Sequence, residues 1–392
     1  MKYSININYP FETMEANRKR MSAWPKYKYA DRVPVQFCLE PRYYTPIFKL
    51  EYNEIFKDPE TQFGLLLEFA KYQIEHIPSD SFCQEPTVWV HPYFDNVAGA
   101  SACGGNVQWP YDQTPQAYPP SIATMDQMDA FEMPELDAGL FGTKIEWWHI
   151  FNDLTKEAEV TFNGKPGRVM VSPLSINHLG PFMIAIDLVG MDFYWWILEE
   201  PERCHRFLGK LATYLSEAEL NVRKIDPRPR PSYMIAEDSS TVMSAEAFKE
   251  FTIPYTKVMY DRCGTGAGIA LGRGMHMCGP STHLHELLID DLKITSFDIF
   301  GYQVPPETVA KNMGGKTLLW GNINPMLMLN GTREEVKKAA MEALEAIAPC
   351  GGFLLGDGAN VCPHTPLENL AALTEASIEY SKINCDLFSN LL

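Results

Sequence analysis

The sequence predicts an α/β fold built on a parallel sheet, and three observations support this prediction. Short, continuously apolar runs recur along the chain, and each is followed by a turn and then by a segment with helical periodicity. Continuous apolar strands that alternate with helices are typical of a parallel sheet covered on both faces. Eight such runs occur in 392 residues, which matches the strand number and the usual length of a closed (β/α)8 barrel, or TIM barrel.

The predicted strands are, in chain order, RVPVQFCLE (32–40), DSFCQEPTVWV (80–90), PFMIAIDLV (181–189), SYMIAED (232–238), GMHMCG (274–279), ITSFDIFG (294–301), KTLLWGNIN (316–324) and GGFLLGDGAN (351–360). Two Pro-rich stretches, 109–120 and 226–232, separate segments of similar composition and are interpreted as long loops. We therefore expect residues 1–392 to form a single domain, in which residues 1–30 are a helical N-terminal extension.

Two helix starts are marked by their capping residues. In GTREEV, Thr332 is expected at the N-cap with Glu335 at the third helical position, which is a capping box. In TPLENL, Thr365 is expected at the N-cap, followed by Pro366 and Glu368. Both boxes follow predicted strands, as β–α units require.

The composition excludes several classes of function. With 46% hydrophobic and 21% charged residues, the chain can bury a large core. A formal charge of −17 argues against nucleic-acid binding and against an anionic membrane surface, because both need clustered Lys or Arg. No apolar run is long enough to span a membrane, and the first residues lack the apolar core of a secretory signal, so none is expected there. Nine scattered cysteines indicate reduced thiols, so we expect a cytoplasmic protein.

Polar residues gather where the predicted strands end. In a barrel of this kind the carboxyl ends of the strands form the active face. A rim of polar groups above an apolar interior is what a binding site there requires. The rim residues are Glu40, Glu237, Asp238, His276, Cys278, Asp298, Asn322, Asn324, Asp357 and Asn360.

The stretch GMHMCGPSTHLHE (274–286) holds the most suggestive chemistry. On a strand, His276 and Cys278 point to the same side, with Cα atoms roughly 6.5–7 Å apart, so both side chains can reach one ion. Imidazole nitrogen and thiolate sulfur are ordinary zinc ligands, but a His-x-Cys pair alone lacks the full ligand set. The alternative is a hydrogen-bonded barrel histidine beside a small apolar cysteine. His283 and His285 fall two positions apart on the following helix and cannot share an ion.

Several of these segments resemble the superfamily of uroporphyrinogen decarboxylases and cobamide-dependent methyltransferases. The resemblance runs from about residue 15 to the C-terminus. It rests on AEDSSTVMSAEAFKEFTIPYTKVM, GMHMCG, GNINPMLMLNGTREEV and GGFLLGDGANVCPHTPLENL. It implies a (β/α)8 barrel. GMHMCG is similar to the His-x-Cys strand of the methyltransferase branch, so that branch is favoured.

The resemblance implies a zinc site. His276 and Cys278 match two of the family's ligands, whereas Ala359 stands where the third, a cysteine, is usual. Cys362 is the expected replacement, with Asp357 as the alternative. Asp238 or Glu237 is expected as an acid–base group or as a group that orients a ligand. A purely capping role is the alternative for Asp238.

The same resemblance suggests substrate contacts. Arg42 and Tyr43 follow the first strand, where the decarboxylases carry two arginines, and Asn322 and Asn360 belong to the predicted rim. Because a polycarboxylated macrocycle needs several cationic partners, the decarboxylase pattern is the weaker match.

The implied function is a zinc- and corrinoid-dependent methyltransferase. The cobalamin would be carried by a partner corrinoid protein, and the methyl donor or acceptor would be a small molecule or a thiol. Aromatic residues at the rim would suit a methoxylated aromatic substrate, as in an O-demethylase. Two alternatives stay open: a decarboxylase of a polycarboxylated substrate, and a non-catalytic barrel that binds a corrinoid or tetrapyrrole. No nucleic acid or membrane partner is expected, and a homodimer is left open.

Overall fold

The structure is a computed structural model that describes residues 3–83, 85–265 and 272–388. Its central element is a five-stranded sheet in the order β12-β11-β10-β9-β8, in which all neighbours are parallel. The predicted α/β class with a parallel sheet is therefore confirmed. The strands are β8 (Tyr233–Ala236), β9 (Arg273–His276), β10 (Ser296–Asp298), β11 (Leu318–Ile323) and β12 (Phe353–Asp357).

The register of the sheet brings the carboxyl ends of its strands to one edge. Ala236 pairs with His276, and His276 pairs with Asp298. Single parallel bridges extend the sheet on both sides, from Leu355 of β12 to Val35 and from Ala236 of β8 to Leu179. Side chains that follow β8, β9 and β10 consequently share one face of the molecule.

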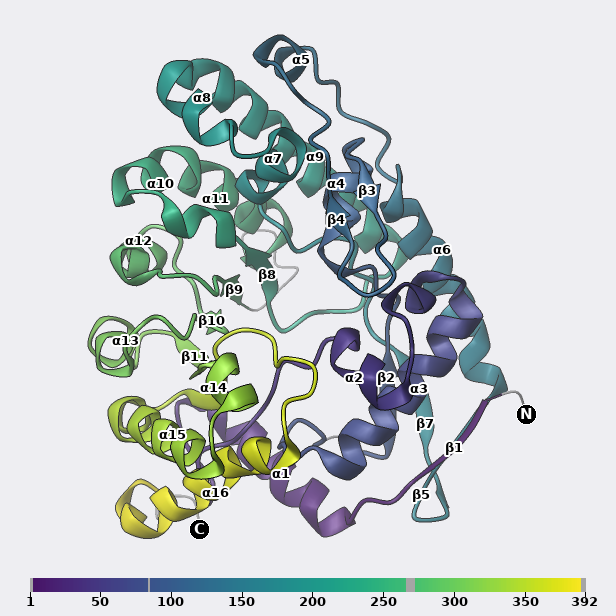
Figure 1. The fold of residues 1–392 in the computed structure, drawn as a ribbon, viewed down its shortest axis with the longest axis vertical. Coiled ribbons are helices and arrows are strands. Elements are labelled where there is room, and N and C mark those ends of the chain that lie inside the picture. Colours follow the sequence, from purple (N-terminus) through teal and green to yellow (C-terminus); the bar gives the residue numbers. More distant parts are fainter. Residues whose placement is uncertain (1–2, 84, 266–271, 389–392) are drawn as a thin grey trace.

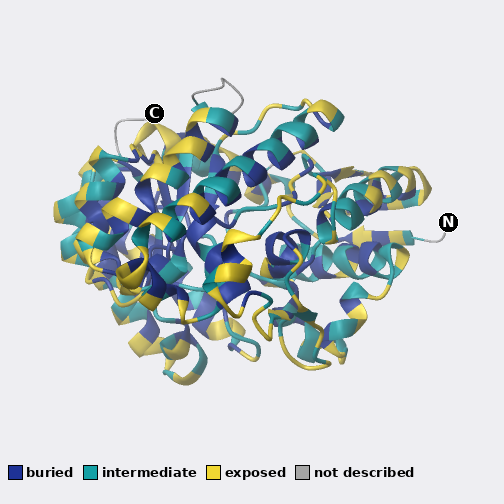
Figure 2. Ribbon diagram, turned by 90° about the horizontal axis from the view of Figure 1, so that it is seen from above, coloured by how far each residue is buried: buried dark blue, intermediate teal, exposed yellow. Residues whose placement is uncertain are grey.

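Helices surround the strands in a ring (Figure 1). Their inner faces are buried and their outer faces are exposed (Figure 2). The helices of the first half are α1 (Phe11–Ala23), α2 (Pro41–Phe48), α3 (Pro59–His76), α4 (Ala98–Ala102), α5 (Met125–Asp129) and α6 (Leu140–Leu154). Those of the second half are α7 (Pro181–Val189), α8 (Phe193–Glu199), α9 (Pro201–Ile225), α10 (Ala245–Phe251), α11 (Ile253–Cys263), α12 (His285–Asp290), α13 (Pro306–Met313), α14 (Pro325–Asn330), α15 (Arg333–Ile347) and α16 (Leu367–Ile383).

A smaller hydrophobic core lies beside the main one and includes the N-terminal strand. It is formed by side chains of α3 and α6 together with short strands. The predicted N-terminal extension is therefore not wholly helical, because a strand precedes α1 and pairs in parallel with β5. The remaining strands are β1 (Tyr3–Ile7), β2 (Thr87–Val90), β3 (Val107–Gln108), β4 (Gln116–Ala117), β5 (Ala158–Phe162), β6 (Lys165–Pro166) and β7 (Arg168–Val171).

Six of the eight predicted strand runs contain strands, but the run 181–189 is wrong, since it forms helix α7. Pro181 starts this helix, and residues on most of its sides are buried, which gives a continuous apolar run. Such a run does not distinguish a buried helix from a buried strand. The run 32–40 contributes only the bridge at Val35.

The two predicted caps have different outcomes. Thr332 forms the expected capping box with Glu335. The cap at Thr365 is wrong, because α16 starts at Leu367 with Pro366 as its N-cap. The Thr365 hydroxyl instead donates to the Cys362 carbonyl at 2.8 Å.

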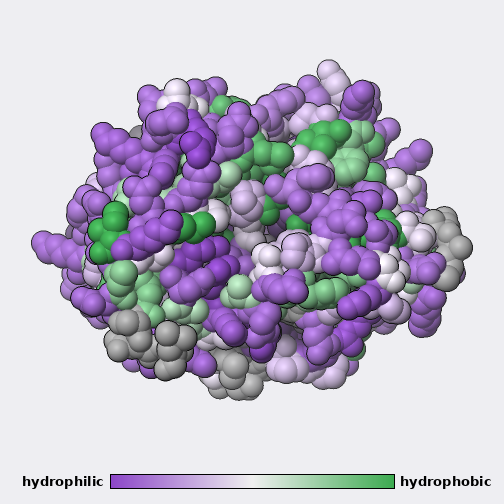
Figure 3. Space-filling view, turned by 90° about the horizontal axis from the view of Figure 1, so that it is seen from below, coloured by the Kyte–Doolittle hydropathy of each residue, from purple (hydrophilic) through white to green (hydrophobic). Residues whose placement is uncertain are grey.

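Among the described residues, no single helix combines the length and the apolar composition of a membrane span. The bent pair α7 and α8 satisfies this criterion only when the two helices are taken together, and they meet at 107°. Hydrophilic side chains predominate on the face seen in Figure 3, with scattered apolar areas between them.

Candidate functional site

Asp238, His276 and Cys278 meet at the carboxyl ends of β8 and β9. One ligand atom from each residue lies within 4.8 Å of the other two. Asp238 comes two residues after the end of β8, and Cys278 comes two residues after the end of β9. Because these strands are neighbours in the sheet, the two turns that follow them lie side by side.

Hydrogen bonds fix the orientation of this cluster. Asp238 Oδ1 accepts a hydrogen bond from the Cys278 backbone N–H at 2.7 Å and lies 3.5 Å from His276 Nε2. His276 Nδ1 lies 3.1 Å from the Asp298 carbonyl oxygen. With the proton on Nδ1, the imidazole donates to that carbonyl and leaves its Nε2 lone pair facing Asp238, which is the usual arrangement for a metal-binding histidine.

The donor set fits zinc. A carboxylate oxygen, an imidazole nitrogen and a thiol are three of its ordinary ligands, and three protein ligands leave a position for substrate. Burial and the Asp238 carboxylate raise the pKa of the Cys278 thiol to about 12, so a bound cation would be needed to hold it as a thiolate. The alternation expected for the strand is also present, since Met275 and Met277 are fully buried on the other side.

Glu237 precedes Asp238 in the chain, and its carboxyl group binds the first turn of helix α7. Its carboxyl group is fully buried and accepts hydrogen bonds from Thr256 and Ser240 and from the backbone N–H groups of Phe182 and Met183. It therefore caps the first turn of α7. A Cβ at Gly180 would collide with this carboxyl group. The Glu237 backbone N–H donates to the His276 carbonyl oxygen at 3.1 Å, but its carboxyl group is not one of the clustered donor groups, whereas that of Asp238 is.

The two residues predicted as third ligand lie elsewhere. In the described part of the chain, the group able to hold a metal contains neither Cys362 nor Asp357. The Cys362 carbonyl accepts hydrogen bonds from Thr365. The buried Asp357 carboxyl accepts a hydrogen bond from the Cys38 backbone N–H at 2.9 Å and so ties β12 to the segment after Val35. The third residue of this group is Asp238.

The four predicted substrate contacts have the following surroundings. Asn322 donates hydrogen bonds to the carbonyl oxygens of Gly301 and Val304, and so fixes the loop between β10 and α13. Asn360 accepts a hydrogen bond from the Cys38 thiol. Tyr43 is buried and packs edge-on against Tyr44, and Arg42 lies in the first turn of α2. None of the four lines the cavity described next.

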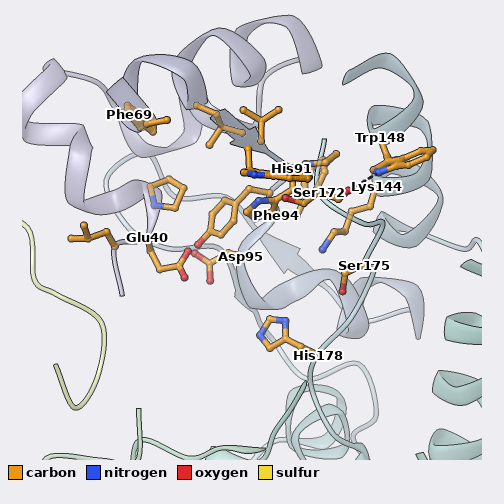
Figure 4. Close-up of a pocket in the computed structure, with 18 of the residues that line it drawn as sticks. Glu40, Phe69, His91, Phe94, Asp95, Lys144, Trp148, Ser172, Ser175 and His178 are labelled. Atoms are coloured by element: carbon orange, nitrogen blue, oxygen red, sulfur yellow. Dashed lines mark hydrogen bonds between the residues drawn. The ribbon is translucent and has the colours of Figure 1, made fainter. Parts of the chain in front are cut away.

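A cavity of about 570 Å³ opens between the strand ends and helices α3 and α6. Figure 4 shows the carboxyl groups of Glu40 and Asp95 close together on one side and the ammonium group of Lys144 on the other. His91 is a further polar residue of the lining. Ligand pockets of small-molecule enzymes have this size and this mixture of apolar walls with a few polar groups.

His178 lines the cavity and also interacts electrostatically with the cluster of Asp238, His276 and Cys278. Its pKa is lowered to about 4 by burial, by Lys144 and by His276. His178 precedes Leu179, which bridges to β8, so it also stands at a strand end. The sequence interpretation missed it because the strand was placed at 181–189. The alternation of the buried Leu174 and Ile176 in LSINHL was the available signal.

The two histidines that follow in the sequence, His283 and His285, contact other parts of the chain. His283 lies in a single 3-10 turn and its Nε2 is 2.8 Å from the Met243 carbonyl oxygen. His285 begins α12 and its Nδ1 is 3.3 Å from the Asn312 amide. Neither belongs to the cluster.

An α/β fold with Asp, His and Cys donors at neighbouring strand ends, beside a ligand-sized cavity, defines a candidate metal-dependent enzyme. The family model "Uroporphyrinogen decarboxylase (URO-D)" matches residues 90–380, so the chain belongs to this family. It thus falls in the superfamily of uroporphyrinogen decarboxylases and cobamide-dependent methyltransferases, as the sequence motifs predict.

The similar proteins come from both branches. A methylcobamide:CoM methyltransferase, MtaA, from Methanosarcina barkeri is 28% identical over 215 residues, covering 51% of this chain and 56% of the relative. A uroporphyrinogen decarboxylase from Coxiella burnetii is 32% identical over 71 residues, covering 18% and 19%. The matched part of the chain thus spans about half the length of the methyltransferase relative and about a fifth of the decarboxylase relative. A solved methyltransferase from Methanosarcina mazei has the same fold, with a TM-score of 0.67, 19% identity, and coverage of 93% and 99%.

Proposed function

We propose that this protein is a zinc- and corrinoid-dependent methyltransferase, which moves a methyl group between a small molecule and the cobalt of a partner corrinoid protein. The observation that carries the proposal is the cluster of Asp238, His276 and Cys278. The likeness to methylcobamide:CoM methyltransferases supports the choice of reaction. A cytoplasmic location and a methoxylated aromatic substrate are part of the proposal.

The residues of the site have separate tasks in this reaction. Asp238, His276 and Cys278 would hold zinc, which would supply Lewis acidity to the heteroatom that loses or gains the methyl group. The Asp298 carbonyl orients His276 through Nδ1. The Cys278 N–H orients the Asp238 carboxylate. The cavity that His178 lines would hold the small molecule away from water.

The cavity argues against the decarboxylase alternative. A polycarboxylated macrocycle needs several cationic partners. Among the described residues that line the cavity, Lys144 is the only lysine and no arginine is present. The third alternative, a non-catalytic barrel, predicts binding without turnover.

We also propose that the central sheet is part of a closed (β/α)8 barrel within a single domain. The bridges at Val35 and Leu179 lengthen the sheet at both edges. The Asp80 N–H donates to the Val35 carbonyl at 2.7 Å, which places the chain leading to β2 beside that edge. The fold shared with the M. mazei methyltransferase supports this topology.

Metal content tests the function most directly. We expect about one zinc per chain in the purified protein, and loss of most of it in His276→Ala, Cys278→Ser and Asp238→Asn. His283→Ala is the matched control, because His283 lies near the cluster but outside it and should leave the metal in place. Cobalt(II) substitution should give a thiolate-to-cobalt absorption band that disappears in Cys278→Ser.

Activity provides the second readout. The zinc-loaded protein should demethylate a methyl ether, methylamine or methyl thiol with cob(I)alamin, or methylate a thiol from methylcobalamin. A folded wild-type protein that binds no zinc would exclude the proposal. A zinc-loaded protein without turnover in the full screen would favour the non-catalytic alternative.

A further inference from the structure

The two polar ends of the cavity indicate the chemical class of its ligand. Lys144 projects from α6 toward the cavity centre (Figure 4). Among the described residues, no carboxylate is within ion-pair distance of its ammonium group and no acceptor is within hydrogen-bond distance. The Glu219 carboxylate attracts this ammonium group, but Glu219 already pairs with Arg223 and Arg230. A cation enclosed by protein without a direct partner is costly, so an anionic ligand group is the natural complement.

The environment of Lys144 is suited to a single negative charge. Enclosure lowers the pKa of Lys144 to about 8, so the amine is still mostly protonated at neutral pH. The other basic side chains of the lining are the imidazoles of His91 and His178, and the described lining holds no second lysine and no arginine. A single ammonium group balances a carboxylate or a sulfonate, whereas a doubly charged phosphate would need more cations.

The opposite end of the cavity is an acceptor site. The carboxyl groups of Glu40 and Asp95 lie close together (Figure 4). The Tyr52 hydroxyl donates to Asp95 at 2.9 Å, and burial followed by the Asp95 charge raises the pKa of Glu40. Two adjacent carboxyl groups repel a second anion and attract a hydroxyl donor.

Aromatic side chains contribute to the cavity lining. Phe69 and Phe94 are buried, and Trp148 is fixed by its indole N–H, which donates to the Ser172 carbonyl at 3.0 Å. Rigid rings of this kind favour a flat apolar ligand body.

We propose that the cavity binds a small hydroxylated aromatic acid, with its acidic group on Lys144 and its hydroxyl group on the Glu40–Asp95 pair. This inference rests on the proposed function, because it treats the cavity as the substrate site of the neighbouring metal centre. His178 lines the cavity and is close enough to His276 for the charge of that imidazole to lower its pKa, so the reacting heteroatom would lie on this side of the ligand.

Binding to the full-length, zinc-supplemented protein tests the inference without turnover. Isothermal titration calorimetry should show that 4-hydroxybenzoate binds at least about 10-fold more tightly than benzoate, which lacks the hydroxyl, and than phenol, which lacks the acid. Titration of 4-hydroxybenzenesulfonate distinguishes a carboxylate site from a sulfonate site. Whichever of this compound and 4-hydroxybenzoate binds more tightly shows which acidic group the site prefers.

Two variants test which end of the cavity binds the acidic group and which binds the hydroxyl group. Lys144→Met should weaken 4-hydroxybenzoate at least about 10-fold and leave phenol unchanged, whereas Glu40→Leu should remove the preference for 4-hydroxybenzoate over benzoate. Lys338→Met, at an exposed lysine of α15, is the matched control and should change no affinity. Circular dichroism verifies that each variant is folded.

The outcomes separate the two proposals. Equal affinity for the three ligands, no binding of any of them, or an unchanged affinity in Lys144→Met would overturn the inference and leave the metal centre untouched. Absence of zinc from the wild-type protein would overturn the methyltransferase proposal, while the ligand preference and its dependence on Lys144 would stand.

Discussion

Among single residues, Asp187 on helix α7 should make stability depend on pH. Burial raises the pKa of its carboxyl group to about 7, whereas in the unfolded chain this group titrates near ~3.9. Between these values the folded state holds a proton that the unfolded state has lost, so the free energy of unfolding falls as pH rises. We expect Asp187→Asn to raise the free energy of unfolding at pH 8 by up to about 4 kcal/mol.

Urea unfolding at several pH values measures this effect. The wild-type and Asp187→Asn curves should converge below pH 4, where the carboxyl group is protonated in both states. Asp192→Asn, at an exposed aspartate just beyond the end of α7, should show no such pH-dependent gain. A constant difference between wild type and Asp187→Asn at all pH values would contradict the assignment.

The site shows what residue types and spacing can predict. The i, i+2 alternation on one strand was sufficient to pair His276 with Cys278, and the structure brings the two together. The role of Asp238 as a third donor depends on the contact between β8 and β9, which are separated by about forty residues in sequence. Lys144 could not be predicted as a site residue, because it lies within helix α6 and no motif or predicted strand end marks it.

At the scale of elements, the capping box of α15 makes a separate prediction. The Thr332 hydroxyl accepts from the Glu335 N–H, and Glu335 in turn accepts from the Thr332 N–H. Thr332→Ala leaves an N–H at the helix start without its acceptor and should lower the free energy of unfolding by about 1 kcal/mol. Thr332→Ser keeps the hydroxyl and should remain close to wild type. Urea unfolding compares the two variants, and equal losses in both would show that the methyl group matters instead.

The elements also show where prediction from the sequence fails. The predicted strands at 316–324 and 351–360 are confirmed as β11 and β12, and each run is short and has glycine residues at or just before its start. The error at α7 arose because Glu237, a residue distant in sequence, caps this helix and its neighbours bury it on most sides. Tertiary contacts of this kind decide between helix and strand, and local periodicity does not contain them.

For the whole molecule, the important question is whether the two hydrophobic cores unfold together. Side chains of Leu66 on α3 and Trp148 on α6 pack against both cores. Ile7 of β1 is fully buried in the smaller core and pairs with Phe162 of β5. If the chain is one cooperative domain, as we propose, then loss of packing at Ile7 should weaken the distant central sheet as well.

Ile7→Ala tests this coupling. Removing a buried isoleucine side chain should lower the free energy of unfolding by about 2–5 kcal/mol. Ile383→Ala, at the exposed end of α16, is the matched control and should change it by less than about 0.5 kcal/mol. Native-state hydrogen exchange should show that Ile7→Ala reduces protection of β11 by the same free energy as protection of β5. Reduced protection of β5 with unchanged protection of β11 would mean that the two cores open independently, and the central sheet with its metal centre would then be the separate stable unit.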